Sequence, residues 1–325
     1  MKKTNTPLKV LLRLSILLIA LSAILMILIA RPSFFNKLNF PTQQQASAES
    51  LKKHVIHLSE NLSPRSSDDL DNLNKAAHYI QQHLKKYSKD VSYQNFNVAD
   101  NEYKNVIAKF GSNSEQIIVI GAHYDAYSKY AGADDNASGV AGLLELAKLL
   151  SQLQLNSQIQ LVAYTLEEPP FFRSENMGSY IHAKSVKDKN IKLMISLEMI
   201  GYFTDEENTQ EFPTSLMKIA YPTTGNYIAI VDQLFSNKAS DIKKTINAHT
   251  DLPAYSINAP SSIPGIDFSD HLNYWKFGFP AVMVTDSSFY RYQHYHTAQD
   301  THEKLNYQAM AKVVYGVFKY IEEFD

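Results

Sequence analysis

The chain is 325 residues long, contains no cysteine and carries a formal net charge of −2. With 45% hydrophobic and 20% charged residues, it has the composition of a folded globular protein and not of a disordered chain. Without cysteine, disulfides, thiolate metal sites and a cysteine nucleophile are excluded, so a metal site must use histidines and carboxylates. The slightly negative charge argues against nucleic-acid binding, which normally needs a basic surface.

The N-terminal segment is basic and then strongly apolar. No charge interrupts residues 14–30, and a helix of that length spans about 26 Å at about 1.5 Å per residue, close to the thickness of a bilayer core. Four basic residues precede the run: Lys2, Lys3, Lys9 and Arg13. This bias places the N-terminus in the cytoplasm and the rest of the chain outside it, on the periplasmic or extracellular side.

A cleaved signal peptide is the alternative explanation of this segment. It fits poorly, because cleavage after Ala30 would leave Leu28, a large residue, at position −3. We therefore predict a cytoplasmic segment at 1–9, a transmembrane signal anchor at 10–30, a polar linker at 31–50 and one folded domain at 51–325.

The folded domain alternates apolar strands with amphipathic helices. Apolar runs predict strands at 91–98, 105–110, 116–121, 159–166, 193–200, 227–231 and 281–285. Helical spacing of apolar residues predicts two helices after the linker, the clearer at 70–84, and further helices at 140–150 and 310–321. This alternation is typical of an α/β domain with a mostly parallel sheet covered on both faces. Residues 203–265 are weakly patterned, and we predict excursions over the edge or mouth of the sheet there.

Histidines and carboxylates follow the predicted strands, at the edge of the sheet where ligands bind in α/β folds. They are His123 and Asp125, Asp134 and Asp135, Glu167 and Glu168, Glu198, and the histidines at 294, 296 and 302. Several have an ordinary explanation, such as helix capping by Asp134 and Asp135. Glu198 does not, because a lone charge in an apolar strand is costly unless it is paired or metal-bound. Imidazole and carboxylate together suit zinc, and a bridging carboxylate suits a pair of zinc ions.

The order of these motifs resembles metallopeptidase family 28, the co-catalytic zinc aminopeptidases, whose relatives include glutamate carboxypeptidase and glutaminyl cyclase. The resemblance rests on His-x-Asp at 123–125, Gly-Ala-Asp-Asp-Asn-Ala-Ser-Gly at 132–139, Glu-Glu at 167–168, Leu-Glu-Met at 197–199 and His-Thr-Ala-Gln-Asp-Thr at 296–301. It covers about residues 115–305. It implies a single zinc-exopeptidase-type domain with a mixed, mostly parallel sheet flanked by helices, acting on peptide substrates.

The resemblance also implies roles for individual residues. Five side chains would hold two zinc ions: His123 and Glu198 one ion, Glu168 and His296 the other, and Asp135 both. Glu167 would be the general base for a metal-activated water, and Asp125 would orient the ring of His123. The family tends to have a cis peptide after the bridging aspartate, here between Asp135 and Asn136. Histidine and carboxylate ligands would also accept cobalt or manganese.

Alternative functions remain open from the sequence. Glu198 stands where the aminopeptidases mostly have aspartate, which leaves the direction of exopeptidase action open. A carboxypeptidase would need a basic pocket, which Arg173 or Arg291 could supply. Glutaminyl cyclases resemble the chain but bind a single zinc, and an inactive binding protein would have lost ligands. The segment Ser269–His271 resembles a family segment that packs near the site.

Overall fold

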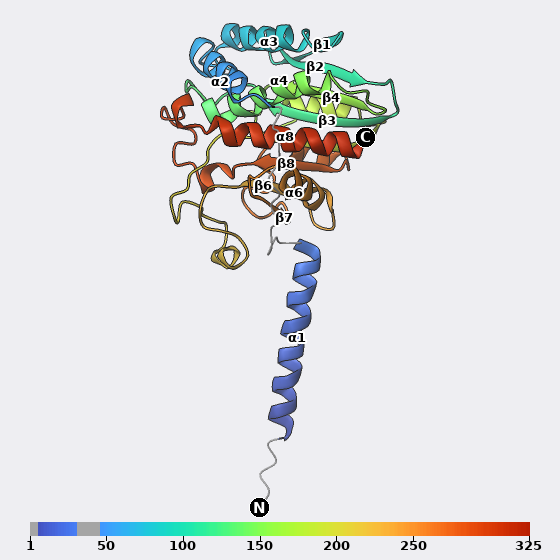
Figure 1. The fold of residues 1–325 in the computed structure, drawn as a ribbon, viewed down its shortest axis with the longest axis vertical. Coiled ribbons are helices and arrows are strands. Elements are labelled where there is room, and N and C mark those ends of the chain that lie inside the picture. Colours follow the sequence, from blue (N-terminus) through green and yellow to red (C-terminus); the bar gives the residue numbers. More distant parts are fainter. Residues whose placement is uncertain (1–5, 31–45) are drawn as a thin grey trace, which may run out of the picture.

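The computed structural model describes residues 6–30 and 46–325, and its body is built on one sheet (Figure 1). The strands are β1 Asp90–Val98, β2 Asn101–Gly111, β3 Gln116–His123, β4 Gln158–Tyr164, β5 Asn190–Glu198, β6 Ile228–Asp232, β7 Ala254–Asn258 and β8 Ala281–Thr285. They form an eight-stranded sheet in the order β1-β2-β4-β3-β5-β8-β6-β7.

The central strands run parallel. β3 pairs in parallel with β4 and β5, β5 with β8, and β6 with β7. The pairs β1/β2, β2/β4 and β6/β8 are antiparallel. This arrangement confirms the predicted mixed, mostly parallel sheet. It also brings the carboxyl ends of β4, β3, β5 and β8 to one edge.

Helices cover both faces of the sheet. They are α2 Ala48–Ile56, α3 Leu70–Leu84, α4 Gly139–Leu150, α5 Gly178–Ser185, α6 Lys238–His249, α7 His271–Lys276 and α8 Tyr307–Phe324. Because side chains alternate along a strand, β3 contributes Ile118 and Ile120 to the core that holds the apolar faces of α3, α4 and α8. It contributes Ile117 and Val119 to a second core, which includes Ala183 of α5 and Tyr274 of α7.

The N-terminal helix α1, Thr6–Ala30, contains the predicted apolar span. Within it, Lys9–Ile27 has a mean hydropathy of 2.7 and is long and apolar enough to cross a membrane. This is consistent with a membrane anchor and equally with a signal sequence. Most of the predicted linker, residues 31–45, and residues 1–5 lie outside the described part of the chain. α2 begins at Ala48, inside the predicted linker.

The stretch 203–265 differs in part from the prediction. It contains an irregular segment with a 3₁₀ turn at Ser215–Ile219 and the predicted strand 227–231, which is β6. It also contains α6 and β7, and the strands β6 and β7 extend the sheet beyond β8. β7 was not predicted, because its five residues include two polar ones and give only a weak strand pattern. Of the five residues that α6 buries, only Ala239, Ile242 and Ile246 are apolar, so its helical period is faint in the sequence.

Candidate metal centre

The five predicted ligands meet at the carboxyl edge of the parallel strands. His123 and Glu198 are the last residues of β3 and β5. Glu168 follows β4, and His296 lies in the segment after β8. Asp135 belongs to the irregular turn Ala133–Ser138 that leads into α4, and its peptide bond to Asn136 is cis.

The first cluster contains His123, Asp135 and Glu198, all buried. Nε2 of His123 lies 3.3 Å from Oδ1 of Asp135 and 3.3 Å from Oε2 of Glu198. Nδ1 of His123 lies 3.1 Å from the main-chain oxygen of Asp125, which can only accept a hydrogen bond. This contact makes Nδ1 the donor to the main chain and turns Nε2 toward the two carboxylates.

The second cluster contains Asp135, Glu168 and His296. Nε2 of His296 lies 3.1 Å from Oδ2 of Asp135 and 3.1 Å from Oε2 of Glu168. Asp135 therefore turns one carboxylate oxygen toward each histidine. The two clusters are joined through this single side chain.

The donor set fits zinc ions. Nitrogen and oxygen atoms bound about 2.0–2.2 Å from a tetrahedral zinc lie roughly 3.3–3.6 Å apart. The spacings of 3.1 Å and 3.3 Å within the two clusters are close to that value. Among the described residues, Nε2 of His123, Nε2 of His296 and Oε1 of Glu168 are buried without a hydrogen-bond partner. Buried polar atoms of this kind need a partner, and a cation held between them would supply one.

The charges of the site also call for a cation. Burial by itself lowers the pKa of His123, but the carboxylates of Glu198 and Glu167 outweigh burial and raise it well above 6.5. Burial, followed by the negative charge of Asp135, raises the pKa of Glu168 to about 8. Burial also raises the pKa of Glu198. Carboxylates crowded away from water are costly unless positive charge compensates them.

Glu167 and Asp125 lie beside the clusters in different ways. Oε2 of Glu167 is 3.9 Å from Nε2 of His123, farther than the carboxylates of either cluster are from their histidine. Burial raises the pKa of Glu167 well above its usual value, although His123 opposes the shift. Asp125 contacts two predicted ligands, because its main chain accepts from His123 and its Oδ2 accepts from the backbone N–H of Glu168 at 3.0 Å.

An aromatic sandwich around His296 was not predicted. The ring of Tyr127 stacks on that of His296 with centroids 4.1 Å apart and planes 4° apart, and Tyr295 stacks at 3.8 Å and 18°. Tyr295 directly precedes His296, so its proximity was available from the sequence. Tyr127 follows β3 and reaches His296 only through the path of its loop.

Ser269 is a further residue that contacts the centre. Its hydroxyl donates to Oε2 of Glu198 at 2.7 Å and lies 2.9 Å from the hydroxyl of Ser196. His271 belongs to neither cluster, and its Nε2 lies 2.8 Å from the main-chain oxygen of Ile266. The segment expected to pack near the site therefore reaches it through its serine.

The two arginines considered for a carboxylate pocket are engaged elsewhere. Arg173 pairs with Asp267 and lies over the rings of Phe172 and Phe268. Arg291 is 4% exposed and donates to Gln210 and to the main-chain oxygen of Tyr227. Neither borders the cavity beside the clusters.

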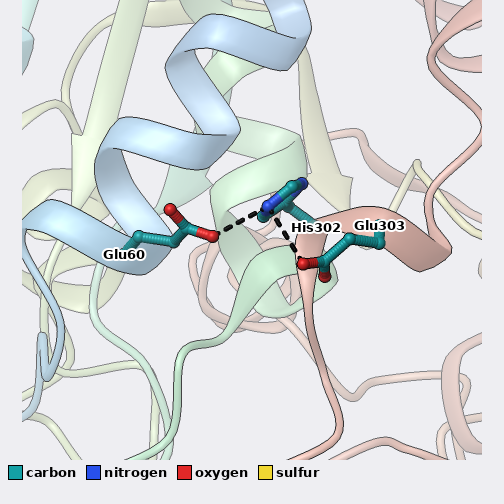
Figure 2. Close-up of side chains that lie close together, drawn as sticks. All are labelled: Glu60, His302 and Glu303. Carbon is teal, nitrogen blue, oxygen red and sulfur yellow. Dashed lines mark ion pairs between the residues drawn. The ribbon is translucent and has the colours of Figure 1, made fainter.

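His302 also lies apart from the centre. Figure 2 shows its ring between Glu60 and Glu303, at Nε2–O distances of 2.8 Å and 3.3 Å. Both glutamates are more than half exposed. The trio links the segment after α2 to the chain that follows His296.

A largely apolar cavity opens from the clusters across β6, β7 and β8. It encloses about 1110 Å³, including its open mouth. Besides the cluster residues, its wall includes Phe172, Tyr221, Tyr227, Val231, Tyr255, Phe268, Met283 and Phe289. Within the described chain, Glu211 is the only charged lining residue outside the centre, and no lysine or arginine lines the cavity.

The fold and the paired clusters define a metal-dependent exopeptidase, a class of hydrolases that includes the zinc aminopeptidases. Residues 105–321 match peptidase family M28, and the chain belongs to this family.

Two curated relatives illustrate how close the family members are. The chain is 47% identical over 285 residues to the uncharacterized protein YfbL of Escherichia coli K12, covering 85% of this chain and 88% of that protein. It is 28% identical over 229 residues to leucine aminopeptidase 1 of Ajellomyces dermatitidis, covering 65% of this chain and 54% of the relative. The chain therefore spans about half of the fungal enzyme.

Two solved structures share the fold at low identity. A zinc aminopeptidase from Bacillus subtilis superposes with a TM-score of 0.69 at 14% identity, covering 87% of this chain and 96% of that one. A glutaminyl cyclase from Porphyromonas gingivalis superposes with a TM-score of 0.64 at 19% identity, covering 86% and 99%. The fold alone thus accommodates both reactions.

Proposed function

We propose that this chain is an aminopeptidase that binds two zinc ions and removes N-terminal residues from peptides. One observation carries the proposal: Asp135 lies 3.3 Å from Nε2 of His123 through one oxygen and 3.1 Å from Nε2 of His296 through the other. A carboxylate placed in this way can act as a ligand that bridges two metal ions. His123 and Glu198 would complete one site, and Glu168 and His296 the other.

Glu167 is the proposed general base. Bound zinc would act as a Lewis acid and lower the pKa of water to about 7. Glu167 borders the cavity beside both clusters, so its carboxylate can take a proton from the attacking water and return it to the leaving amine. Asp125 would hold His123 and Glu168 in place through its two hydrogen bonds.

The cavity supports a preference for bulky apolar N-terminal side chains. Its wall is aromatic and aliphatic, and such surface favours side chains like leucine and phenylalanine. The absence of lysine and arginine from the described lining favours an aminopeptidase over a carboxypeptidase, which has to bind a terminal carboxylate. The similarity to leucine aminopeptidase 1 points the same way.

We further propose that α1 anchors the enzyme and that residues 46–325 lie outside the cytoplasm. The basic residues before the apolar span support this orientation. With a C-terminal tag on the full chain, protease added outside intact spheroplasts should remove the tag. Protection of the tag until lysis would contradict the orientation.

Peptides blocked at one end test the direction of cleavage. The zinc-loaded full chain should release leucine from a peptide with a free N-terminus, tolerate a C-terminal amide, and fail when the N-terminus is acetylated. Loss of cleavage with the C-terminal amide would indicate a carboxypeptidase. Formation of pyroglutamate from N-terminal glutamine peptides, without hydrolysis, would indicate a cyclase. Peptide binding without any turnover would indicate a binding protein.

A further inference from the structure

A fully buried arginine lies directly behind the metal centre. Arg65 precedes α3, and its side chain has no exposed surface. Among the described residues, no carboxylate lies within ion-pairing distance of 4.0 Å of its guanidinium. Burying an arginine without a direct counter-ion is costly unless its N–H groups are hydrogen-bonded. The hydrogen bonds of Arg65 therefore have to compensate for the lost hydration.

All of its hydrogen bonds are to main-chain carbonyl oxygens. Nε donates to Tyr124 at 3.0 Å, Nη1 to Leu58 at 2.6 Å and to Ala131 at 2.8 Å, and Nη2 to Gly132 at 2.8 Å. Tyr124 lies between His123 and Asp125, and Ala131 and Gly132 begin the loop that carries Asp135. One planar guanidinium therefore ties together two of the three segments that supply ligands to the first cluster, those of His123 and Asp135.

Asp300 holds the same loop from the other end. Its Oδ1 accepts from the backbone N–H of Asp134 at 2.9 Å, and its Oδ2 accepts from that of Asp135 at 3.2 Å. Tyr292 donates to Asp300 at 3.1 Å and fixes the carboxylate. Gly132 has a φ of 56°, which favours glycine. The loop is also tightly packed there, because a Cβ on Gly132 would lie 2.6 Å from that of Ala126.

The charge of Arg65 also faces the centre. Burial lowers its pKa to about 10, while Asp300, Asp125, Asp135 and Glu168 oppose the shift. The guanidinium is therefore charged at neutral pH. It offsets part of the negative charge of the clusters without occupying a ligand position.

We propose that Arg65 is a positioning residue of the metal centre, which with Asp300 clamps the loop 131–135 so that the two oxygens of Asp135 face the two histidines. The proposal rests on the proposed zinc centre. It predicts that loosening the clamp weakens both zinc sites together, because Asp135 belongs to both.

Zinc affinity in three variants tests the clamp. Arg65→Met removes the charge and the hydrogen bonds, and Arg65→Lys keeps the charge but cannot span four carbonyls. Asp300→Asn turns an amide NH₂ toward one of the two backbone N–H groups. Arg173→Lys is the matched control, since Arg173 pairs with Asp267 outside the loop.

Zinc affinity would be measured by competition with a chromophoric chelator on the purified full chain, below the unfolding temperature of each variant. The visible spectrum of the cobalt form would report ligand geometry, which loss of stability alone does not change while the chain stays folded. We expect a 10- to 100-fold loss of affinity at both sites in the three variants, the range found for residues that orient metal ligands, and an altered cobalt spectrum. The control should match the wild type.

Wild-type affinity and cobalt spectra in folded Arg65→Lys and Asp300→Asn would overturn the clamp, even if Arg65→Met does not fold. Loss at only one zinc site would overturn it as well. A wild-type chain that binds no zinc would instead overturn the proposed function, and the clamp with it.

Discussion

The neighbouring glutamates after β4 offer a sharp test of the proposed roles. Glu167→Gln removes the proton acceptor but keeps the size of the side chain of a buried residue. Because Glu167 is buried among other carboxylates, replacing it with a neutral amide of the same size should not destabilise the fold. Oε2 of Glu167 is 3.9 Å from His123, whereas that of Glu168 is 3.1 Å from His296, so zinc should stay bound in the Glu167 variant.

The expected loss follows from the contribution of general acid–base catalysis. Removing the base should lower kcat by about 10²- to 10⁴-fold, which corresponds to about 2.7–5.4 kcal/mol in the barrier. Turnover of a leucine peptide would be measured together with zinc content by elemental analysis. Glu168→Gln is the matched control and should lose zinc as well as turnover. Turnover within threefold of wild type in Glu167→Gln, or loss of its zinc, would refute the assignment.

Three further predictions follow from the contacts described above. Tyr127→Ala should weaken zinc binding by roughly 2- to 13-fold, which corresponds to about 0.5–1.5 kcal/mol for an aromatic stack, while Tyr127→Phe should bind zinc like the wild type. Equal zinc affinities of Tyr127→Ala and the wild type in a chelator competition would contradict the stacking role. Val231→Trp should fill the cavity and lower kcat/KM for peptides with N-terminal leucine or phenylalanine by roughly 10- to 200-fold, while kcat/KM for N-terminal alanine should not change. An equal loss for all three peptides would show that the cavity does not hold the N-terminal side chain of the substrate. Burial, followed by the positive charge of His83, lowers the pKa of His54 from 6.5 to about 3. The unfolded chain therefore binds a proton at His54 more tightly than the folded chain does. The free energy of unfolding should fall as the pH drops from about 6.5 toward 3. His54→Gln should flatten that decline in urea titrations, and an unchanged slope would contradict the linkage.

The sheet and the cluster of candidate ligands were predictable from sequence because both follow simple rules. The apolar runs that became β3, β4, β5 and β8 are short and bounded, and parallel strands bring their carboxyl ends to one edge. A histidine or carboxylate at or after each strand end therefore had to meet the others. Glu198 was the clearest signal, because an apolar strand does not bury a lone carboxylate without a partner.

The residues that hold this cluster in place were not predictable in the same way. Arg65 is far from the motifs in sequence, and its partners are main-chain carbonyls, which leave no pattern of side chains. Tyr127 reaches His296 only through the conformation of a loop. β7 lies at the edge of the sheet. A strand there can be short and partly polar, whereas a central strand is buried on both faces and needs apolar residues.

Zinc content per chain tests the two-metal centre most directly. The full-length wild type, loaded with zinc and dialysed, should hold two ions, and Asp135→Ala should hold fewer than one because both sites lose the shared carboxylate. One ion in the wild type that survives Asp135→Ala, or none at all, would contradict the centre described here.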